Sequence, residues 1–158
     1  IKKSMETYQS KYLAKKINAH ALRMVHESCS SHIGSCLSIT DILAVLYNDI
    51  LNIKSDEPNM PHRDRFILSK GHACAALYAT LALKDFFNVE QLSTFASFNS
   101  TLMSHASHKV PGVEFSTGSL GHGLPFGVGK ALFAKMNNIY KSKWFWMTNK
   151  RFIRSMCY

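Results

Sequence analysis

Apolar residues recur at helical spacing in the N-terminal part of the chain. Between residues 7 and 28 they fall three and four apart, which predicts an amphipathic helix whose apolar face carries Leu13, Ile17, Ala21, Met24 and Val25. A second helix is predicted over residues 41–50, and Ser38 followed three residues later by Asp41 resembles a capping box at its start. The segment CSSHIGSCL, which carries His32, is predicted to be the loop between them.

Strand-type and helix-type patterns alternate in the middle of the chain. The proline-containing segment NIKSDEPNMPHRD leads into RFILS, a short apolar run of strand type. After the loop KGH, the segment ACAALYATLALKDFF is rich in Ala and Leu and predicts a buried helix. A strand, a short loop and a helix make up half of a βαβ unit. We therefore expect an α/β fold with a parallel sheet flanked by helices.

The stretch STGSLGHGLPFGVGKALFAKM, residues 116–136, is glycine-rich at its start and continues at helical spacing. Such an entry into a helix can cradle a phosphorylated ligand with free N–H groups, or it can be a turn before a tightly packed helix. Composition favours packing for Gly123 and Gly127, which lie four apart, while Gly118 and Gly121 could shape a binding turn. Further on, KWFWM predicts another buried strand.

Composition limits the class of protein. The chain has 158 residues, 46% of them hydrophobic, which is typical of one packed domain. No apolar run is long enough for a membrane span, and no signal-peptide core is evident, so we expect a cytoplasmic protein with no membrane partner. Four scattered cysteines indicate reduced thiols. The net charge of +9 comes from dispersed lysines without regularly interleaved aromatics, so no nucleic-acid partner is expected.

Three histidines fall in predicted loops: His32 between two helices, His72 between a strand and a helix, and His105 in a long polar connection. Imidazole can donate or accept protons and bind phosphate near neutral pH, and α/β proteins place their sites in loops at strand ends. A chance distribution of surface histidines remains the alternative for each one alone. The Cys/His pairs in these loops match no recognised framework, so no metal site is predicted.

Three segments resemble, in family order, motifs of the N-terminal, diphosphate-binding part of transketolase. They are SSHIGSCLSITDILAVLY, RDRFILSKGHACAALYA and LMSHASHKVPGVEFSTGSLGHGLPFGVGKALFAK. The similarity covers roughly residues 10–141. It implies an incomplete thiamine diphosphate-binding fold, from an enzyme that moves a two-carbon ketol unit from a ketose phosphate to an aldose phosphate.

The resemblance also implies roles for individual residues. His32 matches a histidine that contacts substrate and assists proton transfer, and His72 matches one near the cofactor diphosphate. His105 matches the histidine that orients the cofactor-bound carbon fragment. The family's turn that holds the thiamine pyrimidine is matched by Gly118, Ser119 and Leu120.

The chain also departs from the family pattern. Ser31 stands where the family has Gly, Ala106 where it has Pro, and His122 where it has Gln. The family's Gly-Asp-Gly motif and later Asn, which bind Mg²⁺ or another divalent ion, have no counterpart, because no Asp or Glu follows Glu114. We expect residues 1–140 to be the N-terminal part of the diphosphate-binding domain. Residues 141–158 would be a divergent basic and aromatic tail, consistent with a truncated, frameshifted reading.

Family members also need a pyrimidine-binding domain, on the same polypeptide or on a partner subunit, whose glutamate activates the cofactor. This chain has no such section, so we expect it to be inactive alone, to require a C-terminal transketolase subunit or section, and to form a homo-oligomer when complete. Sugar phosphates are the expected substrates. The alternatives are a non-catalytic remnant or partner-binding module of the same fold, or a deoxyxylulose-phosphate-synthase-like enzyme, which DRFILSKGH matches less well.

Overall fold

The computed structural model describes residues 2–60, 63–137, 143–147 and 152–156, with only the backbone for 2–7, 143–147 and 152–156. The helical elements are α1 (Lys2–Glu27), α2 (Ile33–Leu37), α3 (Thr40–Val45), the π-helical turn η1 (Leu46–Ile50), the 3₁₀ turn η2 (Gly71–Ala73), α4 (Cys74–Leu83), the 3₁₀ helix η3 (Val89–Thr94) and α5 (Gly123–Met136). The strands are β1 (Arg65–Leu68), β2 (Lys143–Met147) and β3 (Phe152–Met156). Helical elements stand on both sides of β1 in the chain, and β2 and β3 follow one another after α5, so the described residues combine helices and strands as expected for an α/β fold.

The described strands form one sheet in the order β1-β2-β3. β1 and β2 are parallel, with Arg65 opposite Trp144, whereas β2 and β3 are antiparallel. The strand predicted from KWFWM is confirmed as β2. The prediction of a parallel sheet is therefore confirmed for β1 and β2 only. It is wrong for β3, which runs antiparallel to β2 and makes the sheet mixed.

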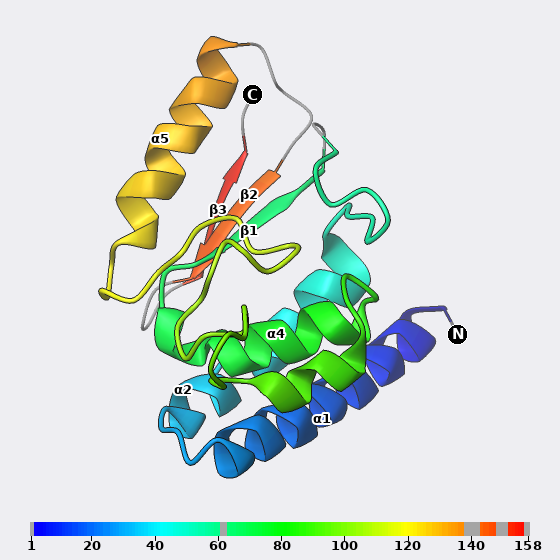
Figure 1. Cartoon of the computed structure of the whole chain (residues 1–158). Coiled ribbons are helices and arrows are strands. Elements are labelled where there is room, and N and C mark those ends of the chain that lie inside the picture. The colour runs from blue at the N-terminus through cyan, green and yellow to red at the C-terminus, as the bar shows by residue number, and fades with distance from the viewer. Residues whose placement is uncertain (1, 61–62, 138–142, 148–151, 157–158) are drawn as a thin grey trace.

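Strand β1 separates two apolar layers. Its side chains alternate between the faces of the sheet, so Phe66 and Leu68 join the large core on one side. Ile67 points to the other side, where it packs with Ala134 of α5. Figure 1 shows α5 running along the sheet on one side, with α4 and α1 on the other. Helices thus flank the sheet, as predicted.

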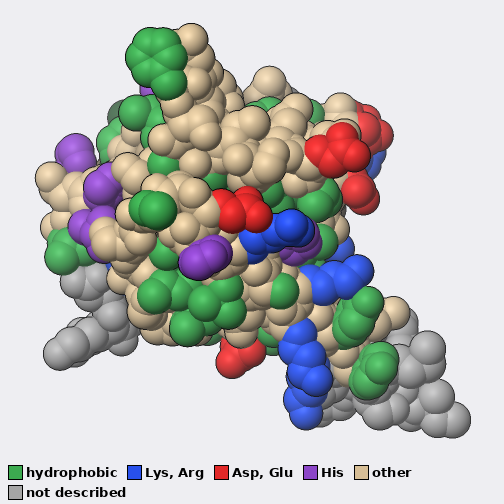
Figure 2. Space-filling model, turned by 60° about the horizontal axis from the view of Figure 1, so that its bottom comes forward, with side chains coloured by type: hydrophobic (Ala, Val, Ile, Leu, Met, Phe, Trp, Pro, Cys, Tyr) green, Lys and Arg blue, Asp and Glu red, His purple; other side chains and the backbone are tan. Residues whose placement is uncertain are grey.

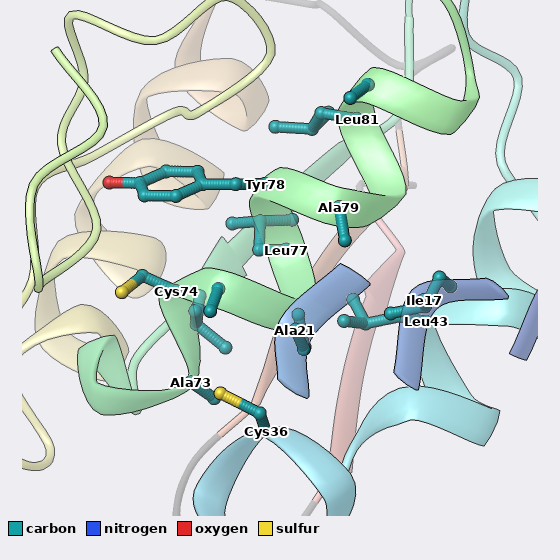
Figure 3. Packing of buried hydrophobic residues seen from close by; sticks show 14 of the residues in the cluster. Ile17, Ala21, Cys36, Leu43, Ala73, Cys74, Leu77, Tyr78, Ala79 and Leu81 are labelled. Carbon is teal, nitrogen blue, oxygen red and sulfur yellow. The ribbon is translucent and has the colours of Figure 1, made fainter. Parts of the chain in front are cut away.

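The larger core is built around α4, which the sequence predicted to be a buried helix. Every residue from Cys74 to Ala82 is buried, and the many alanines allow close contact with α1. The predicted apolar face of α1 is confirmed, since Ile17, Ala21 and Met24 are buried there. Figure 3 shows Ile17 and Ala21 of α1 facing Leu43 and the small side chains of α4.

The second predicted helix is divided into α3 and the π-helical turn η1, and it is not capped as expected. α3 starts at Thr40 with Ile39 at the N-cap, and no side chain caps it. The hydroxyl of Ser38 instead donates to the carbonyl of Ser35 at 2.9 Å and accepts a hydrogen bond from Nζ of Lys70 at 2.7 Å. The capping-box prediction is wrong because the helix starts two residues after Ser38, whose hydroxyl has other partners.

The loop predicted over CSSHIGSCL is wrong in its second half, because Ile33–Leu37 form the short helix α2, whose first turn is closed by hydrogen bonds to the carbonyl of His32. The strand predicted from RFILS is β1, and the helix predicted after the glycine-rich stretch is α5. A boundary at residue 140 falls outside the described residues and stays a prediction. No helix among the residues that the structure describes is long and apolar enough to cross a lipid bilayer.

Candidate active site

The fold brings the three predicted histidines together from separate segments. His32 precedes α2, His72 lies in η2 after β1, and His105 lies in the long loop between η3 and α5. The ring centroids of His32 and His72 are 4.6 Å apart, and those of His72 and His105 are 4.8 Å apart. His32 and His105 are separated by 5.7 Å. We call these three side chains the histidine cluster.

His32 lies in the turn from α1 into α2 in a left-handed conformation, with φ 79° and ψ 13°. Histidine is one of the few non-glycine residues enriched in this region of backbone space. The carbonyl of His32 accepts hydrogen bonds from the amides of Ser35 at 2.9 Å and Cys36 at 3.3 Å. These bonds tie the His32 backbone to the first turn of α2.

His72 is held by a close approach of two backbone segments. A Cβ atom built at the preceding residue, Gly71, would lie 2.2 Å from the carbonyl oxygen of Thr117. The Thr117 hydroxyl donates to the carbonyl of Leu68 at 2.5 Å, and its amide donates to the carbonyl of Ala106 at 3.1 Å. Thr117 therefore joins the end of β1, which leads into the η2 turn with His72, to the loop that carries His105.

The environment of His72 favours its neutral form. Burial, followed by the neighbouring rings of His32 and His105, lowers the pKa of His72 below its ordinary value. Its Nδ1 atom is buried and has no hydrogen-bond partner among the described residues. Buried polar atoms are almost always paired in native proteins, so an unpaired imidazole nitrogen beside two other histidines is available to a bound group.

A cavity of about 310 Å³ adjoins the cluster. It is lined by His32 and His72, by Ser30, Ser31 and Ser104, and by three cysteines, Cys29, Cys36 and Cys74. Burial raises the pKa of the Cys36 and Cys74 thiols, so both remain protonated. The Sγ atom of Cys36 faces the carbonyl of His72 at 3.9 Å, and that of Cys74 faces the carbonyl of Met103 at 3.6 Å. Both cysteines are buried, and Cys74 belongs to the helix that was predicted to be buried. A group of histidine side chains is visible at one edge of the surface in Figure 2.

The predicted pyrimidine turn is only partly next to the cluster. A Cβ atom at Gly118 would lie 3.5 Å from Cδ2 of His105, so Gly118 lies directly against that ring. Ser119 and Leu120 are exposed, and no hydrogen bond among the described residues joins them to the three histidines. The packing predicted for Gly123 is confirmed, because a Cβ atom there would lie 2.8 Å from Cα of Ser69.

Comparison with known proteins decides the family. Residues 9–152 match the family described as "Transketolase, thiamine diphosphate binding domain". The chain belongs to this family.

Relatives agree along most of the chain. One of the subunits of apulose-4-phosphate transketolase from Phocaeicola vulgatus is 43% identical over 124 residues, which are 78% of this chain and 44% of that protein. Human transketolase is 38% identical over 140 residues, covering 83% of this chain and 22% of its own length. The crystal structure of transketolase from Campylobacter jejuni has a TM-score of 0.77 and 33% identity, covering 83% of this chain and 21% of that one. The chain thus spans less than half the length of these transketolases.

Sequence reasoning missed two residues that position the histidine cluster and its surroundings. Lys70, which precedes Gly71 in the loop after β1, is buried, and burial lowers the pKa of its amine. Nothing in the sequence pattern indicated that its amine donates to the Ser38 hydroxyl. Thr117 was also missed, although a threonine followed by a glycine turn is a plausible anchor for a loop.

Among the described residues, no group of three or more His, Cys, Asp or Glu side chains is arranged to hold a metal ion. This does not test the expectation that the chain has no metal site. The transketolase family description names thiamine diphosphate alone. A divalent ion for this protein therefore belongs with the proposals that follow.

Proposed function

We propose that this chain is the diphosphate-binding section of an enzyme that transfers a two-carbon ketol unit between sugar phosphates with thiamine diphosphate. The observation that carries the proposal is the histidine cluster, in which three imidazoles from separate segments lie within 5.7 Å of one another. Membership of the transketolase family supports the cofactor, and the name of the Phocaeicola vulgatus relative supports a sugar phosphate as substrate.

The described residues fit thiamine diphosphate in two respects. The unpaired, buried Nδ1 of His72 needs a hydrogen-bond partner, and a diphosphate oxygen would provide one. Beyond its chain neighbours, a Cβ atom built at Gly118 would meet only the His105 ring within 4 Å, so a flat ring could approach the backbone there. When bound, thiamine diphosphate supplies the carbanion stabilisation that ketol transfer requires. Ser119 and Leu120, which are exposed, would complete the contact with the pyrimidine.

His32 and His105 would act on the sugar. Their ring centroids are 5.7 Å apart, and each lies within 4.8 Å of the His72 centroid, so a substrate hydroxyl can reach either ring beside the cofactor site. An imidazole can give or take a proton at a hydroxyl and can also bind a phosphate ester. We propose His32 as the proton-transfer residue and His105 as the residue that orients the transferred fragment.

The chain would work with a second section. The Phocaeicola vulgatus relative is named as one subunit of its transketolase, and the chain covers 44% of it. We propose that a C-terminal transketolase subunit or section supplies the activating glutamate, that Mg²⁺ or another divalent ion is held largely outside the described residues, and that the complete enzyme is a homo-oligomer. Exposed apolar side chains on α5 support such a contact: Val128, Leu132, Phe133 and Met136.

Calorimetric titration with thiamine diphosphate and Mg²⁺, with and without a C-terminal transketolase subunit, tests the proposal. We expect saturable binding that weakens at least about tenfold in His72→Gln, because a buried hydrogen bond to a charged group is lost. His108→Gln is the matched control, since His108 lies in the same loop as His105 but pairs with the Ser116 hydroxyl at 2.7 Å. No heat with or without the subunit would overturn the proposal and favour a non-catalytic remnant.

A further inference from the structure

Helix α4 contacts the His105 loop through two side chains one turn apart. Cys74 faces the carbonyl of Met103 at 3.6 Å, and the Tyr78 hydroxyl donates to the carbonyl of His105 at 2.8 Å. The same hydroxyl accepts a hydrogen bond from the amide of Ser107 at 3.0 Å. Figure 3 shows both side chains pointing from α4 toward this loop, away from α1.

The Tyr78 hydroxyl is fixed in one orientation. The side chain is completely buried, and its ring packs edge-on against Phe95 with centroids 6.2 Å apart. Burial raises the pKa of the hydroxyl, so it stays protonated and keeps its donor. The phenol hydroxyl can donate one hydrogen bond, which the carbonyl of His105 accepts. Its oxygen accepts one in return, from the amide of Ser107.

These bonds hold the backbone on both sides of Ala106. Tyr78 binds the carbonyl of His105 and the amide of Ser107, while Thr117 binds the carbonyl of Ala106. The loop is therefore attached through three consecutive residues. α4 starts immediately after η2, which carries His72, so Tyr78 connects the His105 backbone to the helix that follows His72.

We infer that Tyr78 is a positioning residue, which sets the distance of the His105 ring from His72 by holding the loop backbone through its hydroxyl. The hydroxyl of Tyr78 bonds to the loop backbone, and no hydrogen bond among the described residues joins it to an imidazole. The consequence for catalysis rests on the proposed function, because it matters only if His105 orients a bound sugar fragment. The geometric part of the inference stands without a cofactor.

Histidine-selective NMR of the full chain tests the geometric part in the absence of thiamine diphosphate. In the wild type, the ring protons of His72 and His105 should give a through-space cross-peak, since their centroids are 4.8 Å apart. Tyr78→Phe keeps the ring and removes the hydroxyl, and we expect this cross-peak to be lost while the peak between His32 and His72 remains. An unchanged cross-peak between His72 and His105 in Tyr78→Phe would overturn the inference.

Thr80→Val is the matched control, because it removes another buried hydroxyl of α4 that bonds only within the helix, to the carbonyl of Ala76 at 2.7 Å. It should leave both cross-peaks in place, and loss of the His72–His105 peak in this variant too would overturn the specific role of Tyr78. A second measurement needs no variant. The amide of Ser107 should exchange with deuterium far more slowly than exposed loop amides such as that of Ser119, and equally fast exchange would also overturn the inference.

The catalytic consequence is measured separately in enzyme reconstituted with a C-terminal subunit. Tyr78→Phe should lower kcat about tenfold or more, because small displacements of a catalytic group cost rate steeply, and should leave the KM for thiamine diphosphate close to that of the wild type. A raised cofactor KM with unchanged kcat would overturn a role through His105. Failure of the wild type to turn over would contradict the proposed function and leave the NMR result standing as the test of the geometry.

Discussion

Replacing Gly71 with Ala tests whether backbone contact fixes the position of His72. A Cβ atom at Gly71 would lie 2.2 Å from the carbonyl oxygen and 2.6 Å from the carbonyl carbon of Thr117. The obstacle is backbone, so a change of side-chain rotamer cannot remove it. Thr117 cannot move away freely either, because its amide binds Ala106 and its hydroxyl binds Leu68. The methyl group therefore has to displace either the turn that carries His72 or the Thr117 end of the loop that carries His105.

The expected cost follows from three terms. Forcing an extra methyl group into a packed site costs about 1–3 kcal/mol. Weakening the two hydrogen bonds of Thr117 adds about 1 kcal/mol for each bond that is lost. The lower conformational entropy of the unfolded chain with Ala offsets about 0.4–1 kcal/mol of this loss. We expect Gly71→Ala to lower the free energy of unfolding by about 2–4 kcal/mol, a large part of the roughly 5–15 kcal/mol of a typical domain.

Urea titration followed by far-ultraviolet circular dichroism measures this loss. Gly129→Ala is the matched control, since a Cβ atom at Gly129 meets no atom within 4 Å beyond its own stretch of helix backbone, and Ala in a helix should stabilise by about 0.5–1 kcal/mol. Removing the Thr117 side chain should not rescue Gly71→Ala, because the clash involves the carbonyl group. A Gly71→Ala protein within about 0.5 kcal/mol of the wild type would refute the reasoning.

Three further predictions concern a buried ion pair, the histidine cluster and a glycine of α5. Glu114→Gln removes the carboxylate partner of the buried Arg63 and should lower the free energy of unfolding by about 3 kcal/mol. Glu27→Gln breaks the exposed pair with Arg23 on α1 and should change the free energy of unfolding by less than about 1 kcal/mol. Equal losses for the two variants in urea titrations would contradict this. Burial and the adjacent histidine rings lower the pKa of His72, so its contribution to stability is full above its ordinary value of 6.5 and is lost as pH falls through the lower folded value. The melting temperature of His72→Phe should therefore decrease less than that of the wild type on acidification, and parallel decreases would contradict this. Gly123→Ala places a Cβ atom 2.8 Å from the backbone after β1 and should cost about 2 kcal/mol in a thermal melt, so an unchanged melt would contradict tight packing there.

Local patterns predicted those elements whose apolar faces are simple. α1 has a single apolar face, and α4 is so rich in Ala and Leu that burial was evident without a partner. The division of residues 41–50 into α3 and η1 could not be predicted, because a π-turn depends on packing rather than on spacing. The capping box failed for a similar reason, since Lys70, far away in the sequence, binds the Ser38 hydroxyl.

The individual histidines of the candidate site could be picked out from the sequence, but their arrangement in space could not. Each histidine could be assigned to a loop, yet their meeting depends on contacts between segments that no local pattern encodes. The hydroxyls of Thr117 and Tyr78 make such contacts by bonding to backbone groups of other segments, and these partners leave no signature in the spacing of side chains. The exposure of Leu120 was likewise hidden, because an apolar residue next to a glycine turn is compatible with either a buried or an exposed position.

Histidine-selective NMR during a titration with thiamine diphosphate and Mg²⁺ tests the central claim most directly. The claim is that three histidines from separate segments form one cofactor and substrate site. The account predicts that the resonances of His32, His72 and His105 move together along one binding curve, while those of His20 and His26 on α1 stay in place. Binding that shifts only the histidines of α1, or that leaves the histidine cluster unchanged, would contradict it.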